Sequence, residues 1–116
     1  MQLDVVVLMG LFSAKQKDFA EVMAAAAGEL AARGTHVAEQ VVQRRGVSHG
    51  GARLMSVPLS RRTLLSSGKV REVAQACQRT GADAVVIVSP STEHQRRSLT
   101  AIFGRPALSL ADALTR

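Results

Sequence analysis

Hydrophobic residues form two short unbroken runs, at residues 5–9 and 84–88. Consecutive apolar residues that end at a turn are typical of a strand buried on both of its faces. A third run, at residues 37–42, is interrupted by polar residues such as Glu39, which predicts a strand at the edge of a sheet. Residues 106–110 form a fourth, shorter run. The pattern therefore predicts four strands, of which the first and third are central.

Between these runs the hydrophobic residues take the three- and four-residue spacing of a helix. The first helix is expected to begin at Ser13, because Gln16 three residues later completes a capping-box pattern, and to end at Gly34. The apolar residues on its inner face are Phe19, Val22, Met23, Ala26 and Leu30.

Two further helices follow from the same reasoning. The second is expected to begin at residues 66–67, where a serine serves as N-cap, and to end before Gly81. The third is expected to begin at residues 91–92 and to end at Gly104. Its apolar residues are Leu99, Ile102 and Phe103. A short fourth helix begins at about residue 111.

Alternation of strands and helices predicts an α/β fold with a small parallel sheet of about four strands in the order 2-1-3-4, flanked by helices on both faces. At 116 residues the chain is expected to form a single domain over residues 1–116. The strand order reverses between strands 1 and 3, which predicts a crevice at their carboxyl ends. Gly10, Ser13 and Ser89 are the candidates there for a nucleotide or another anion.

Positive charge is concentrated in one part of the chain. The net charge is +6, and no acidic residue occurs between Glu39 and Glu72. Much of this segment is expected to be a long basic loop at about residues 44–66. An acid-free basic segment is typical of a surface that binds a polyanion, commonly nucleic acid. The basic residues of the segment are Arg44, Arg45, Arg53, Arg61, Arg62, Lys69 and Arg71.

Several kinds of chemistry lack their residues. Ser67, Gly68 and Lys69 do not have the spacing of a phosphate-binding loop, and the three histidines have no metal-ligand spacing. Cys77 is expected to be a buried structural thiol. We therefore expect a protein that is not an enzyme and that has no metal or cofactor. The single Cys, the lack of a basic leader and the lack of a long apolar run predict a cytoplasmic protein outside the membrane.

Four segments, in order, resemble motifs of the N-terminal domain of the HflX family of ribosome-associated GTPases. They are Val41-Val42-Gln43-Arg44-Arg45, Ser67-Gly68-Lys69-Val70-Arg71-Glu72-Val73, Gly81-Ala82-Asp83-Ala84-Val85-Val86-Ile87 and Gln95-Arg96-Arg97-Ser98-Leu99. This resemblance implies a domain that docks on the RNA of the large ribosomal subunit, either as a stand-alone relative that lacks the GTPase domain or as a piece of a larger protein. It also implies that a GTPase partner acts in trans, and it places Arg44, Arg45, Gly68, Lys69 and Arg97 at the RNA.

Three roles are thus left open by the sequence. The first is a non-catalytic module that docks on ribosomal or other structured RNA through the basic loop and the start of the second helix. The second is a nucleotide or anion site in the crevice. The third is protein interaction, with a homodimer as one form of it.

Overall fold

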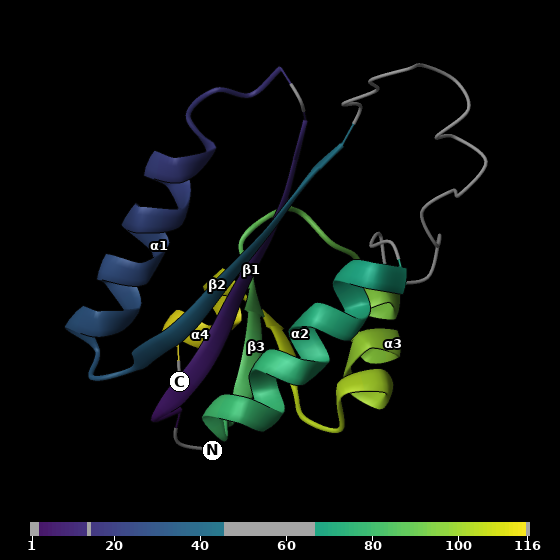
Figure 1. Cartoon of the computed structure of the whole chain (residues 1–116). Coiled ribbons are helices and arrows are strands. Elements are labelled where there is room, and N and C mark those ends of the chain that lie inside the picture. Colours follow the sequence, from purple (N-terminus) through teal and green to yellow (C-terminus); the bar gives the residue numbers. More distant parts are fainter. Residues whose placement is uncertain (1–2, 14, 46–66, 116) are drawn as a thin grey trace.

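The computed structural model describes residues 3–13, 15–45 and 67–115. Its elements alternate along the chain as the hydrophobic pattern predicts (Figure 1). In order they are β1 (Val5–Ser13), α1 (Phe19–Ala32), β2 (His36–Arg45), α2 (Ser67–Thr80), β3 (Ala84–Ile87), α3 (Glu93–Phe103), β4 (Ala107–Ser109) and α4 (Leu110–Leu114).

The four strands form one parallel sheet in the order β2-β1-β3-β4, which confirms the predicted α/β fold and strand order. Strand β3 is buried along its whole length, and β1 is buried over most of it. This is the reason for their unbroken apolar runs, because each strand contacts helices on both faces. Strand β2 lies at the edge, as its interrupted pattern predicts.

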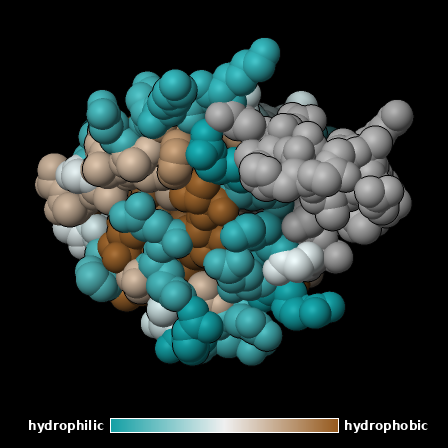
Figure 2. All heavy atoms as spheres, turned by 45° about the horizontal axis from the view of Figure 1, so that its top comes forward, coloured by the Kyte–Doolittle hydropathy of each residue, from teal (hydrophilic) through white to brown (hydrophobic). Residues whose placement is uncertain are grey.

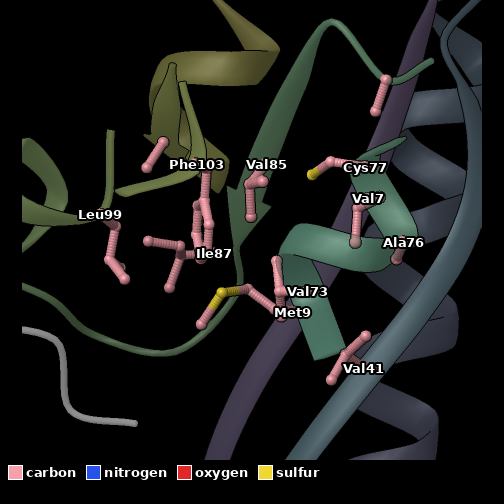
Figure 3. Packing of buried hydrophobic residues seen from close by; sticks show 12 residues of the cluster. Val7, Met9, Val41, Val73, Ala76, Cys77, Val85, Ile87, Leu99 and Phe103 are labelled. Atoms are coloured by element: carbon pink, nitrogen blue, oxygen red, sulfur yellow. The ribbon is translucent and has the colours of Figure 1, made fainter. Parts of the chain in front are cut away.

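Alternate residues of the central strands face two separate hydrophobic layers. One layer packs Val7, Met9 and Ile87 against α2 and α3, as Figure 3 shows, with Val73 and Leu99 among the helix residues. The other layer packs β1 and β3 against α1 and α4, and includes Val6, Leu8, Met23, Leu30 and Val86. Helices therefore cover both faces, with α1 on one side of the sheet and α2 and α3 on the other (Figure 1).

The ends of the second and third helices follow the predicted chemistry. Thr92 caps α3 by accepting a hydrogen bond from the Gln95 backbone, and the Gln95 side chain accepts one from the Thr92 N–H in return. Gly81 and Gly104 follow α2 and α3 with φ of +67° and +70°, a conformation that favours glycine.

Three sequence-based boundaries were wrong. Strand β1 continues to Ser13, so α1 begins at Phe19 and the predicted capping box at Ser13 does not form. The Ser13 carbonyl instead accepts a hydrogen bond from Gln16 N. Strand β2 runs to Arg45, so the first two residues of the predicted basic loop belong to a strand.

Gly10 lies at a close approach between β1 and α1. A Cβ atom there would lie 2.5 Å from the Phe12 ring and 2.9 Å from Met23 Sδ. Because both neighbours are buried, we expect Gly10→Ala to lower the free energy of unfolding by about 1–3 kcal/mol. Gly28, inside α1, has open space around it. We expect the matched Gly28→Ala to raise the free energy of unfolding by about 0.5–1 kcal/mol. Urea unfolding measures both, and a stabilising Gly10→Ala would contradict this packing.

Candidate functional site

The carboxyl edge of the sheet ends in a two-stranded ribbon. Strand β3 pairs with Val6 to Met9 of β1, whereas β2 continues to pair with β1 up to Ser13 and Arg45. The last four residues of β1 therefore extend beyond β3, and the ribbon reaches the top of the molecule in Figure 1. Helices α2 and α3 begin at this same edge.

At the crevice predicted between strands 1 and 3, the candidate residues make their contacts within the protein. Ser89 Oγ accepts a hydrogen bond from Leu11 N at 2.9 Å, in the position that a further β3 residue would take. Ser13 Oγ accepts one from Lys15 N at 3.1 Å. The Cβ position of Gly10 is filled by Phe12 and Met23. These three residues thus shape the edge of the sheet by contacts that need no ligand.

Arg44 lies at the end of β2 and is held against the start of α1. Its guanidinium carbon lies 4.5 Å from the centre of the Phe19 ring, a cation–π geometry. Its Nη2 donates a hydrogen bond to the Gln16 carbonyl at 3.3 Å. The side chain is exposed, so its charge reaches solvent from a fixed position.

The first turn of α2 carries Gly68, Lys69 and Arg71. Gly68 and Arg71 are exposed, and Lys69 Nζ lies 3.1 Å from Glu72 Oε1. A surface ion pair of this kind contributes only about 0–1 kcal/mol of stability. A competing anion can therefore still interact with the ammonium group. The positive end of the helix dipole adds to the potential here.

The first turns of α3 add two arginines to the same edge. Arg97 is exposed and lies 3.6 Å from Glu93. Arg96 Nη1 donates hydrogen bonds to the Ser91 carbonyl at 2.6 Å and to Ser91 Oγ at 2.9 Å. The sequence-based site included Arg97 but not Arg96, because the anchoring of Arg96 on Ser91 depends on the conformation of the loop before α3.

Basic residues outnumber acidic ones at this edge. Among the residues whose side chains the structure describes, it holds Lys15, Lys17, Arg44, Lys69, Arg71, Arg96 and Arg97 against Asp18, Glu21, Glu72, Glu93 and Asp112. The opposite edge is close to balanced, with Arg33, Arg79 and Arg105 against Asp4, Glu29, Glu39 and Asp83. Figure 2 turns the carboxyl edge toward the viewer and shows hydrophilic side chains over much of it, with hydrophobic ones between them.

The structure thus places Arg44, Gly68, Lys69, Arg71 and Arg97 at one edge, as the residues of the predicted interface require. Strand β2 ends at residue 45 and α2 begins at residue 67, both at this edge. Arg53, Arg61 and Arg62, which belong to the same prediction, lie outside the described residues, as does most of the predicted loop at 46–66.

Asp83 links the beginnings of β3 and β1 at the opposite, amino-terminal edge of the sheet. Its Oδ2 accepts hydrogen bonds from the backbone N–H of Asp4 at 2.9 Å and of Val5 at 3.0 Å. Donation from these N–H groups holds the pKa of the Asp83 carboxyl below its ordinary value. The carboxylate therefore stabilises the fold above the unfolded-state pKa, and this contribution is lost as the pH falls through the folded-state pKa.

The variant Asp83→Asn lacks that charge at every pH. We expect the melting temperature of the wild-type protein to exceed that of Asp83→Asn near pH 6. The difference should shrink as the pH falls below about 4, where the carboxyl begins to protonate. Thermal unfolding of both proteins across this range measures the effect. A difference that stays constant down to acidic pH would contradict the assigned role.

Cys77 lies inside the layer between α2 and the sheet and is 1% exposed, so its predicted burial is confirmed. Burial raises the pKa of the thiol, and the neighbouring Arg105 opposes this rise. The thiol is therefore protonated near neutral pH and packs as part of the core.

Two absences hold for residues 3–13, 15–45 and 67–115, the part of the chain that the structure describes. Within them, no three His, Cys, Asp or Glu side chains come together in a group that could hold a metal ion. None of their helices is long and apolar enough to cross a membrane.

Comparison with known proteins gives a likeness in fold. No family model matches the sequence, and no curated protein sequence matches it. One solved structure with a similar fold is that of unliganded arylmalonate decarboxylase, with a TM-score of 0.50 and 15% sequence identity. The likeness covers 97% of this chain and 44% of the decarboxylase, so this chain spans less than half of that protein.

These comparisons overturn the resemblance to the HflX family. Neither a family model nor a curated sequence supports it, and a structural neighbour that covers 97% of the chain is a decarboxylase. The structure gives the physical reason. Gly81 closes a helix and Asp83 ties two strands together, so the segment that begins at Gly81 reflects turn geometry that a parallel α/β fold requires.

The prediction that the chain is not an enzyme is corrected by the same comparison. Arylmalonate decarboxylase is an enzyme, and its structure contains this arrangement of strands and helices. The fold is therefore one that an enzyme also has, and a likeness at this identity concerns the fold alone and carries no reaction to this chain.

Proposed function

We propose that this chain binds structured RNA across the carboxyl edge of its sheet, by electrostatic attraction between its arginines and lysines and the RNA phosphates. The proposal concerns binding alone. Phosphate contacts from such side chains position a protein on nucleic acid without reading its sequence.

The observation that supports this proposal most is the difference in charge between the two edges of the sheet. Lys69, Arg71 and Arg97 lie at the same edge as residues 45 and 67, the described residues on either side of residues 46–66. The segment between them supplies three more arginines in the sequence. The opposite edge offers no comparable excess. One surface of the molecule is thus favoured for a polyanion.

An extended anion explains the site better than a small one. Ser13 and Ser89 bond within the protein, and the space beside Gly10 is filled. The basic residues, in contrast, are spread over three elements: the end of β2 and the starts of α2 and α3. A ligand with many phosphates can contact all three elements at once.

A salt titration tests the proposal. The affinity for a fluorescently labelled RNA hairpin, followed by anisotropy, is expected to fall steeply as KCl rises from about 50 to about 200 mM. The slope of log K against log salt should be about −3 or steeper, which corresponds to displacement of several cations from the RNA. An affinity that does not change with salt would overturn the electrostatic interface.

We also place this binding in the cytoplasm, a proposal supported by the free thiol of the single cysteine, Cys77. The ribosome and a GTPase partner were implied by the HflX resemblance alone, and no observation tests either of them. Homodimer formation likewise stays a prediction of the sequence.

A further inference from the structure

Every phenylalanine side chain of this protein is packed within its own fold. The sequence contains three Phe and no Trp or Tyr. Phe12 and Phe103 are buried, at 4% and 7% exposure. Phe19 is half-buried, its ring centre lies 6.0 Å from that of Phe12, and the guanidinium of Arg44 covers it. No phenylalanine ring is thus left for a nucleic-acid base, and the sequence of residues 46–66 contains no Phe, Tyr or Trp, so the only other aromatic rings of the sequence are the imidazoles of its three histidines.

This distribution bears on which form of RNA the basic edge accepts. Proteins that hold single strands stack the bases on aromatic side chains, a contribution of about 1–3 kcal/mol per base. Sequence-specific readers of RNA loops use the same platforms. A double helix keeps its bases stacked on each other and presents phosphates instead. It also carries more charge per unit length than a single strand, so a surface of fixed cations interacts with it more strongly.

The arginines of the edge are held in a way that suits phosphates. A guanidinium plane can also stack on a base. That of Arg44 already lies over the Phe19 ring, and Arg96 is held by two hydrogen bonds to Ser91. Both groups therefore present charge from a fixed position, and their contacts within the protein compete with stacking on a base.

We propose that the ligand of the carboxyl edge is double-helical RNA, contacted through its phosphates, and that single-stranded RNA binds more weakly. This inference rests on the proposed function and adds to it the form of the polyanion. It assigns no base-specific contact to the protein.

The test compares two labelled RNAs with equal numbers of nucleotides. A duplex of about 16 base pairs and an unstructured oligouridine of about 32 nucleotides carry nearly the same number of phosphates. Their dissociation constants are measured by anisotropy with the full chain, in the same buffer at about 50 mM KCl. We expect the duplex to bind about tenfold more tightly.

The possible results distinguish the preference for double-helical RNA from the proposal of RNA binding on which it rests. An oligouridine affinity equal to or higher than that of the duplex would overturn the inference while leaving RNA binding in place. Failure of both RNAs to bind at low salt would overturn the proposed function and the inference together. A duplex preference that weakens as salt rises would support both.

Discussion

Replacing Leu8 by alanine is expected to lower the free energy of unfolding by about 3–5 kcal/mol. Leu8 is fully buried in the centre of β1, where it packs in the layer shared with α1 and α4. Both neighbouring strands pair with it, Gln40 on one side and Val86 on the other. The backbone at this point is therefore fixed from both sides, and the sheet has little freedom to close the cavity that the smaller side chain leaves.

Urea unfolding followed by circular dichroism measures this loss, with Ile102→Ala as a control. Ile102 is also a large aliphatic residue, but it is 44% exposed on α3. Its truncation is expected to change the free energy of unfolding by less than about 1 kcal/mol, because it removes little buried area and introduces a better helix former. Equal losses for the two variants would contradict the assignment of Leu8 to the core.

Reversing the charge at the start of α2 is expected to weaken RNA binding about tenfold or more. The variant combines Lys69→Glu with Arg71→Glu, two residues in the first turns of the helix. Each removed phosphate contact should also reduce the salt slope by about one. The fold should tolerate both changes, because acidic residues near a helix N-terminus interact favourably with its dipole.

A matched control reverses the same amount of charge at the other edge. Arg79 is ion-paired with Glu39 as Lys69 is with Glu72, and Arg33 is exposed as Arg71 is. Arg33→Glu combined with Arg79→Glu therefore changes the net charge equally but leaves the carboxyl edge intact. We expect its RNA affinity to fall by less than about threefold. Salt screens the interaction between the RNA and charges at the far edge, so only a small long-range effect remains. Equal losses in the two double variants would show that binding follows net charge rather than this edge.

Much of the fold could be predicted from the sequence because its signals are local. The unbroken apolar runs of β1 and β3 are a direct consequence of burial on two faces, and their order in the sheet follows from that burial. Thr92 with Gln95 defines the start of α3 through contacts only three residues apart.

The errors arose where partners far apart in the sequence decide the structure. Ser13 looked like a helix cap, yet pairing with the end of β2 keeps it in a strand. Arg44 looked like a loop residue, but the Phe19 ring, from the start of α1, holds its guanidinium. The site could be predicted only as a set of charges. Which of these charges share an edge depends on the right-handed crossovers of the sheet, and the anchoring of Arg96 on Ser91 depends on the shape of one loop.

The central claim is that RNA binds at the carboxyl edge of the sheet. Amide chemical-shift mapping of the labelled protein with a short RNA duplex tests it most directly, because each residue reports its own position. The largest changes are expected at the starts of α2 and α3 and at the end of β2, in particular at Lys69, Arg71 and Arg97. Residues of the opposite edge, such as Arg33 and Asp83, should change little. Changes concentrated at Arg33 and Asp83, or spread evenly over the protein, would contradict the account.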